Sequence, residues 1–292
     1  MGWAIIFVVL FHFSCWCIET PIINKGFLGV DIFLFLSGYG LYYSYSKNKK
    51  LKEFYIKRIR RIYPMFLIMN IVFITVSVFV KHVPLSIVNV VLKLTTLAYW
   101  IPDASAADWY LNSLFFFYLI TPVLVVLAEK YSRTVYLAML TITCTIVWCN
   151  HDVLMGEKIG LGYSTARIPI FVLGICFANR EFTKMEWLSL GVILIFVFVF
   201  FKTVCYPLAY SAIVLPMMML LSPKNVSHSI IGGVKVLGVY SLEIYVANGF
   251  VKLCVSNIDS ILISSLMYFP LQIIFSIIVI YINKFVQTKM LK

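Results

Sequence analysis

Long apolar runs, each close to 20 residues and separated by short polar connections, fill the chain. A helix needs about 20 apolar residues to cross the hydrocarbon core of a bilayer. The pattern therefore predicts an all-α, polytopic membrane protein with about ten transmembrane helices in one bundle. The expected helices cover residues 1–18, 27–46, 63–82, 109–128, 134–149, 164–179, 185–201, 204–221, 236–255 and 260–283.

A shorter apolar stretch, residues 85–100, lies between the third and fourth expected helices and is interrupted by Lys93. Its length favours a helix that lies at the membrane interface or packs on the bundle. The sequence contains no internal repeat, Ser/Gly-rich linker or low-complexity tract that would separate a second domain. We therefore expect residues 1–292 to form a single membrane domain.

The composition supports a membrane protein, because 62% of the 292 residues are hydrophobic and only 12% are charged. The net charge of +12 does not indicate nucleic-acid binding, since the basic residues flank apolar runs instead of alternating with aromatic residues on one surface. Residues 1–18 lack a charged leading region and a small-residue cleavage site, so we expect a retained span instead of a signal peptide.

The distribution of Lys and Arg predicts the orientation in the membrane. The alternate connections that lie on one predicted side, together with the C-terminal tail, hold 17 of the 24 basic residues. Basic residues are concentrated in cytoplasmic loops. Both termini of a multi-pass protein are therefore expected in the cytoplasm.

Asp31 and His12 are ionisable residues inside apolar helices, where such groups are expensive unless they are paired. A short turn would place their two helices antiparallel and the two side chains at similar depth. A carboxylate that binds one imidazole nitrogen makes the other nitrogen a better base, so the pair could be a catalytic acid–base dyad. A structural pair that clamps the two helices is the equal alternative.

Four cations, Lys57, Arg58, Arg60 and Arg61, precede Pro64 in a predicted charged loop. They can bind anionic lipids and fix the membrane orientation. Arg side chains also make bidentate contacts with phosphate oxygens, so the same cluster could bind the phosphates of a cytoplasmic substrate. Their spacing does not choose between these functions.

Several other polar or aromatic residues, with Asn248 among them, suit an acceptor site. Arg167 and Glu243 lie within predicted helices and should face the protein interior. Trp109 and Tyr110 lie at the outer boundary, where an aromatic belt is the favoured interpretation and stacking on a sugar is the alternative. The carboxylates are scattered and the seven cysteines lie in or beside apolar segments, so we expect no metal site.

Four segments together resemble the acyltransferase 3 family of integral-membrane O-acyltransferases. They are VVLFH (8–12), GFLGVDIFLFLSGY (26–39), FYIKRIRRIYP (54–64) and WYLNSLFFFYL (109–119). Two later segments, RIPIFVLGI (167–175) and LGVYSLEIYVAN (237–248), are similar to further signatures of that family.

This resemblance implies an enzyme of the bacterial inner membrane. It would transfer an acyl group, often acetyl, from cytoplasmic acyl-CoA to a hydroxyl of an extracytoplasmic glycan or lipid-linked saccharide. The resemblance also implies catalytic roles for His12 and Asp31, and donor binding by the basic motif, with no permanently bound cofactor. Two positions depart from the family pattern. Met1 stands where the family usually has Arg, and Asn248 stands where it often has His.

Two other functions remain open at this point. A glycan transporter or flippase would also have about ten helices and buried charges, although paired broken helices are not evident in the sequence. A catalytically inactive family member would explain Met1 and Asn248, because Asn can form hydrogen bonds but cannot shuttle a proton. Detection of acyl-CoA turnover would separate the enzyme from both.

Overall fold

The computed structural model describes residues 1–101, 108–150, 161–180, 183–185, 228–256 and 258–290, with the single residues 188, 192 and 199. Within these residues all regular secondary structure is helical, which confirms the all-α prediction. In the described part of the chain, four helical stretches are long and apolar enough to cross a membrane: Ile23–Ser46, Leu51–Val80, Trp109–Thr143 and Ile261–Lys289.

A fifth span is possible if the bent pair Ile230–Val239 and Ser241–Val255 is counted as one. The predicted number of about ten spans is therefore not confirmed. The expected helices at 185–201 and 204–221 lie almost wholly outside the described residues.

The chain forms two compact units. Unit 1 comprises Met1–Phe33, Arg60–Met69 and Pro216–Lys292, and unit 2 comprises Leu34–Ile59 and Asn70–Leu215. Two helices, α2 (Leu28–Ser46) and α3 (Leu51–Thr75), contribute residues to both units.

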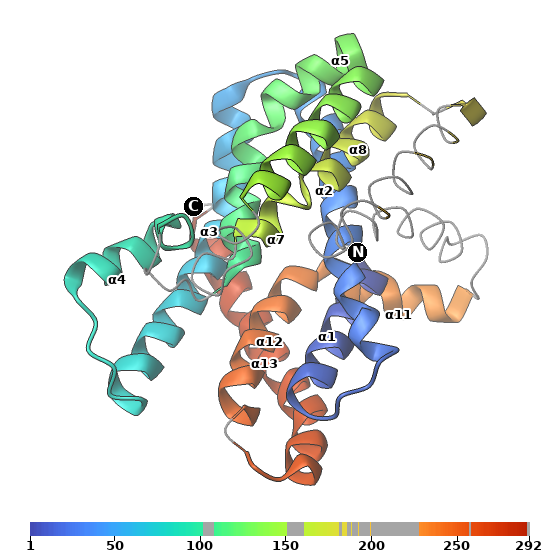
Figure 1. Cartoon of the computed structure of the whole chain (residues 1–292). Coiled ribbons are helices and arrows are strands. Elements are labelled where there is room, and N and C mark those ends of the chain that lie inside the picture. Colours follow the sequence, from blue (N-terminus) through green and yellow to red (C-terminus); the bar gives the residue numbers. More distant parts are fainter. Residues whose placement is uncertain are drawn as a thin grey trace. The chain divides into compact units, whose positions relative to one another are not determined.

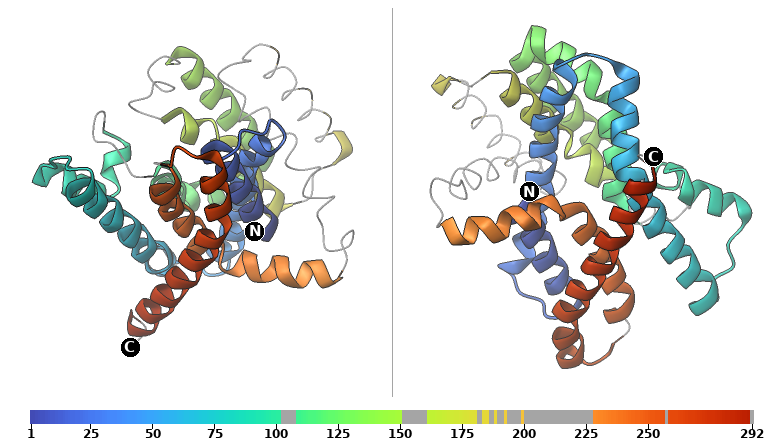
Figure 2. Two further views of the ribbon diagram at one scale, coloured as in Figure 1. Left: turned by 90° about the horizontal axis from the view of Figure 1, so that it is seen from below. Right: turned by 180° about the vertical axis from the view of Figure 1, so that it is seen from behind.

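Unit 1 is built on α1 (Gly2–Trp16), α12 (Ser241–Val255) and α13 (Ile261–Met290), which pack together (Figure 1). The preceding helix α11 (His228–Val239) also contacts α1. The axes of α11 and α12 differ by 75°, so α11 runs across the direction of α12 (Figure 2). The predicted helix at 236–255 therefore begins only at Ser241, after this bend.

Two glycines bring the N-terminal part of α2 and the short helix η1 (Ile23–Phe27) against α1. A Cβ atom at Gly26 would lie 2.3 Å from the carbonyl oxygen of Phe7, and one at Gly29 would lie 2.4 Å from that of Ala4. Such distances are too short for any side chain, so glycine permits the close approach of the two backbones. The contacts also define an antiparallel register, in which Gly29 is level with the turn that contains Ala4.

Unit 2 contains α5 (Trp109–Cys149) packed on α8 (Ile168–Asn179), with the short helices η2 (Val76–Val80), α4 (Ile87–Leu94), η3 (Leu97–Tyr99) and α7 (Leu161–Thr165). The remainder of α2 crosses α8 at a second pair of glycines. A Cβ at Gly38 would lie 2.2 Å from the Phe171 oxygen, and one at Gly174 would lie 2.1 Å from the Phe35 oxygen. Helix α5 is kinked at Tyr131, where the sequence predicted a connection between two helices.

The prediction of a charged loop before Pro64 is wrong for most of that segment. Helix α3 begins at Leu51, so Lys57, Arg58, Arg60 and Arg61 lie on its early turns. Lys, Arg and Glu are strong helix formers, and the connection shrinks to the few residues before Leu51. Pro64 lies inside the helix, where its missing N–H leaves the carbonyl four residues earlier without its helical partner.

That carbonyl belongs to Arg60, and it accepts a hydrogen bond of 2.7 Å from Gln287 Nε2 on α13. A side chain from a neighbouring helix thus replaces the bond that proline removes. This replacement explains why α3 continues through Pro64 within an apolar span.

Candidate functional site

His12 lies in the last part of α1 with an aromatic ring on one face. Its imidazole stacks on the indole of Trp16, with ring centroids 4.5 Å apart and planes 14° apart. The side chain of Asn248 on α12 lies within hydrogen-bonding range of the imidazole, and the charge of Lys252 acts on it. The ammonium of Lys252 also lies 5.9 Å from the Trp16 ring centroid. The structure therefore brings His12 and Asn248 together, and the sequence did not predict this proximity.

Asn248 is buried among α1, α12 and α13, with 1% of its surface exposed. Its Nδ2 donates hydrogen bonds to Tyr268 Oη at 2.6 Å and to Gln272 Oε1 at 2.8 Å. Tyr268 Oη donates in turn to the Val9 carbonyl oxygen at 2.7 Å. These hydrogen bonds fix the Asn248 side chain among residues of α1 and α13. Binding of substrate by Asn248 stays a prediction.

Asp31 lies in the first turn of α2 and is completely buried. The register set by Gly29 places this turn beside the N-terminal half of α1, near Ala4. His12 is about two helical turns further along α1, at 1.5 Å of rise per residue. This register does not place Asp31 and His12 at the similar depth that the sequence predicted. A catalytic role for Asp31 stays a prediction.

The four cations of α3 differ in their surroundings. Lys57, Arg60 and Arg61 are exposed, and their spacing puts them on one side of the helix. Arg58 is half-buried, donates a hydrogen bond from Nη2 to Ser44 Oγ, and holds its guanidinium carbon 5.4 Å from the Phe54 ring centroid.

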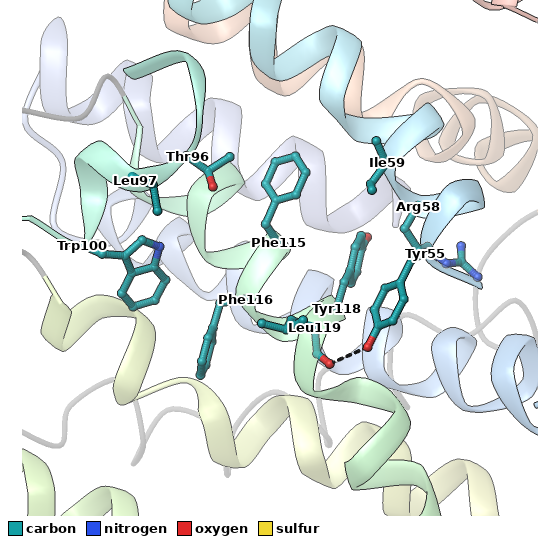
Figure 3. A pocket seen from close by; sticks show the side chains of 10 residues that line it. All are labelled: Tyr55, Arg58, Ile59, Thr96, Leu97, Trp100, Phe115, Phe116, Tyr118 and Leu119. Atoms are coloured by element: carbon teal, nitrogen blue, oxygen red, sulfur yellow. Dashed lines mark hydrogen bonds between the residues drawn. The ribbon is translucent and has the colours of Figure 1, made fainter. Parts of the chain in front are cut away.

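A pocket of about 410 Å³ lies in unit 2 beside Arg58 (Figure 3). Its lining is mostly aromatic and aliphatic, and Tyr55 closes one edge by donating a hydrogen bond of 2.9 Å to the Leu119 carbonyl oxygen. The other lining residues are Ile59, Thr96, Leu97, Trp100, Phe115, Phe116 and Tyr118. Apolar pockets with a few polar groups and volumes of about 300–1,000 Å³ are typical of small-molecule sites.

Glu243 lies in the first turn of α12 and is 9% exposed. Its Oε1 accepts a hydrogen bond of 2.5 Å from Asn283 Nδ2 on α13. Asn283 Oδ1 accepts at 3.5 Å from Gln287, the residue that binds the Arg60 carbonyl. Glu243 thus belongs to a polar chain that leads to the basic helix α3.

Arg167 and Trp109 come together in unit 2. The guanidinium carbon of Arg167 lies 4.9 Å from the Trp109 ring centroid, and Nη1 donates to the Tyr163 carbonyl oxygen at 3.0 Å. Arg167 is only 4% exposed. Tyr110 is buried beside Trp109, with ring centroids 5.9 Å apart.

Three hydroxyl groups form a buried cluster near this Arg–Trp pair. Tyr99 Oη lies 2.5 Å from Ser164 Oγ, which also hydrogen-bonds to Ser113 Oγ. Ser113 Oγ donates to the carbonyl oxygen of Trp109 at 2.6 Å. The cluster connects the segment after α4 to α5 and α7, and so fixes the elements that carry Trp109 and Arg167.

The sequence pointed to Asn248 and Trp109, but not to the other residues that surround His12 and Arg167. One signal was available for unit 1, because Tyr268, Gln272 and Ser276 repeat every four residues and form a polar stripe on an otherwise apolar helix. No comparable signal marked Tyr99, Ser113 and Ser164, which come from separate elements. Among the described residues, no group of three or more His, Cys, Asp or Glu side chains is arranged to hold a metal ion.

Comparison with known proteins gives one match to a family and one to a curated relative. The family described as "Acyltransferase domain" matches residues 2–283. Peptidoglycan O-acetyltransferase OatA of Listeria monocytogenes serovar 1/2a is 39% identical over 83 residues, which is 26% of this chain and 12% of OatA. No solved structure matches the chain.

Proposed function

Since the chain belongs to the acyltransferase 3 family, we propose that it transfers an acyl group from cytoplasmic acyl-CoA to a hydroxyl of an extracytoplasmic glycan. An acetyl group and a cell-surface polysaccharide or lipid-linked saccharide are the proposed acyl group and acceptor, because the relative OatA is named as a peptidoglycan O-acetyltransferase. The observation that carries this proposal is the environment of His12, an imidazole inside an apolar helix with Trp16 on its face and Asn248 within hydrogen-bonding range.

The chemical step needs a base, because a hydroxyl is a poor nucleophile at neutral pH. In the proposed reaction, His12 takes the proton of the acceptor hydroxyl while the hydroxyl oxygen attacks the carbonyl carbon of the thioester. The new C–O bond forms, the C–S bond breaks, and the thiolate of CoA leaves with the proton that His12 held. Asp31 is proposed to stabilise the positive charge on the imidazole through the negative charge of its buried carboxylate, across the separation that the register of α2 on α1 leaves between them.

The donor is proposed to bind at the start of α3. Lys57, Arg60 and Arg61 present exposed cations that suit phosphate groups, and Arg58 adds a guanidinium at the edge of the apolar pocket (Figure 3). This combination of cations and an apolar cavity suits a molecule with phosphates at one end and an acyl-bearing arm at the other.

The acceptor is proposed to contact Trp109, Tyr110 and Arg167. A Trp face can stack on a sugar ring, and the edge of a stacked guanidinium carries N–H donors that suit sugar oxygens. Glu243 and Asn248 were the other candidates from the sequence. Glu243 belongs instead to the polar chain that reaches the Arg60 carbonyl of α3 through Asn283 and Gln287.

The proposed setting is a bacterial inner membrane with both termini in the cytoplasm, because most basic residues fall on one predicted side. Reporter fusions at residues 50 and 290 should give cytoplasmic signals, and a fusion near residue 155 should report the outside. A cytoplasmic signal near residue 155 would contradict this orientation.

Purified protein in lipid vesicles provides the direct test of the reaction. Acetyl-CoA should be consumed faster when a glycan acceptor such as a peptidoglycan fragment is added, and acetyl ester should appear on that glycan. A transporter would move the glycan without consuming acetyl-CoA, and an inactive homologue would bind acetyl-CoA without turnover. Either result would overturn the proposed reaction.

A further inference from the structure

The side-chain amide of Asn248 has one possible orientation. Tyr268 Oη donates its single hydrogen to the Val9 carbonyl oxygen at 2.7 Å, so towards Asn248 this hydroxyl can only accept. The Asn248 atom 2.6 Å from that hydroxyl must therefore be Nδ2, the nitrogen that carries hydrogens.

Gln272 requires the same orientation independently. Its Nε2 donates to the Ile244 carbonyl oxygen at 3.1 Å, and a carbonyl oxygen can only accept. Gln272 therefore directs Oε1 at Asn248, and this oxygen accepts the second hydrogen of Nδ2 at 2.8 Å. Two backbone carbonyls, on α1 and on α12, thus determine which way the Asn248 amide points.

The remaining atom, Asn248 Oδ1, is buried and has no hydrogen-bond partner among the described residues that meets ordinary hydrogen-bond geometry. The Asn248 side chain lies within hydrogen-bonding range of the His12 ring. In the described part of the chain, His12 Nδ1 is likewise buried without a hydrogen-bond partner that meets this geometry. Because Oδ1 can only accept, pairing these two atoms requires the ring proton on Nδ1. The other ring nitrogen then keeps its lone pair, while stacking on Trp16 fixes the plane of the ring.

We infer that Asn248 is a positioning residue that holds the His12 imidazole in one tautomer and one orientation, and that Tyr268 and Gln272 hold Asn248 in turn. The effect on acyl transfer rests on the proposed function, whereas the fixed ring orientation does not. A histidine that must accept a proton at a defined atom needs its tautomer set by a hydrogen bond to the other nitrogen. In this chain a neutral amide from α12 performs that task.

The test uses the full chain in which His82, His151 and His228 are replaced by Gln, so that His12 is the single imidazole. Asn248→Leu removes the acceptor at similar size, and Tyr268→Phe keeps the ring but frees the Asn248 amide. Asn179→Leu is the matched control in unit 2, since Asn179 accepts from Tyr42 Oη at 2.7 Å and donates to the Ala128 carbonyl oxygen at 2.8 Å.

Two readouts are measured in each variant: the rate at which diethylpyrocarbonate modifies His12, followed by peptide mass spectrometry, and the kcat of acyl transfer. In Asn248→Leu both should fall about 10- to 100-fold, as when the hydrogen-bond partner of a functional histidine is removed, with an unchanged donor KM. In Tyr268→Phe the modification rate and kcat should also fall, but by less. In Asn179→Leu neither quantity should change.

Equal modification rates in the parent, in Asn248→Leu and in Tyr268→Phe would overturn the inference. If Asn248→Leu fails to fold, as judged by its size-exclusion profile, Tyr268→Phe decides alone. If the parent transfers no acyl group, the proposed function fails, and the modification rates still decide whether Asn248 orients His12.

Discussion

Two buried polar sites, one around Asn248 in unit 1 and one around Arg167 in unit 2, are built in different ways. In unit 1, Asn248, Tyr268 and Gln272 are neutral, and their hydrogen bonds go to one another and to backbone carbonyls. In unit 2, Arg167 is a permanent cation, and the face of Trp109 covers its guanidinium. The hydrogen bonds in unit 1 fix the orientation of the side chains. The contact in unit 2 places a positive charge against the face of an aromatic ring.

This difference separates the expected effects of mutation. Loss of a hydrogen bond between neutral side chains in unit 1 changes the orientation of the His12 imidazole, so it should affect the chemical step. Loss of the cation or its aromatic face in unit 2 changes what the surface can bind, so it should act on substrate affinity. In kinetic terms, the first class lowers kcat and the second raises KM.

The largest effect is expected at His12. A positioned base commonly contributes about 10²- to 10⁴-fold to the rate, so His12→Gln should lower kcat by that factor while acyl-CoA binding persists. Glutamine keeps a hydrogen-bonding side chain without a titratable base. Near-normal transfer by His12→Gln at equal expression would show that His12 has a structural role only.

Asp31→Asn tests the proposed support from α2. The substitution keeps the shape of the side chain and removes its charge, so kcat should fall, but less than in His12→Gln. Acyl transfer by purified protein measures both variants side by side. An unchanged kcat would show that the Asp31 charge has no part in the chemical step.

A large effect on stability, confined to unit 2, is expected at Gly38. A Cβ there would lie 2.2 Å from the Phe171 carbonyl oxygen, so Gly38→Ala must push α2 away from α8. Overpacking of this kind costs about 1–3 kcal/mol, and the midpoint of thermal unfolding should fall accordingly.

Gly40 on the same helix provides the control, because no atom lies within 4 Å of a Cβ placed there. Gly40→Ala should raise the stability by about 0.5–1 kcal/mol, since alanine favours a helix over glycine. Equal unfolding midpoints for the two variants would contradict the close packing of α2 on α8.

Part of this arrangement could be predicted from the sequence. The apolar run at 27–46 ends at a cluster of lysines, and the observed helix, Leu28–Ser46, has almost the same bounds. The family was identified from short motifs around His12 and Asp31, and the match over residues 2–283 confirms it. In both cases the signal lies within a few neighbouring residues.

The features that were not predicted depend on contacts between distant segments. The predicted start of α3 is too late, because a charged stretch indicates a loop only weakly when its residues, Lys and Arg, favour helices. The polar stripe of Tyr268 and Gln272 is visible in the sequence, but its periodicity does not say which helix it faces. The approach of Gly38 to α8 likewise joins segments more than a hundred residues apart.

A smaller effect is expected from the basic residues of α3. Changing Arg58, Arg60 and Arg61 to Ala together should raise the KM for acyl-CoA more than it lowers kcat, because these side chains are proposed to hold phosphates. Arg60→Lys should retain only part of the affinity, since Lys lacks the bidentate fork.

Arg58 sharpens the comparison because, unlike Arg60, it is half-buried and bonded to Ser44 within unit 2. Arg58→Lys should therefore also disturb the edge of the apolar pocket, and discrimination between short and long acyl donors should change in this variant alone. An unchanged donor KM in the triple variant, at normal membrane levels, would leave these residues as orientation signals.

The smallest effect is expected at Trp109. Trp109→Leu removes the aromatic face beneath Arg167, and such a cation–π contact is worth about 0.5–2 kcal/mol, or a few-fold to about 30-fold in acceptor KM. Trp109→Phe keeps an aromatic face and should recover most of this loss. Because the contact concerns binding, kcat should stay near the wild-type value in both variants. A fall in kcat with an unchanged acceptor KM would place Trp109 in the chemical step, and the division of roles between the two units would then be wrong.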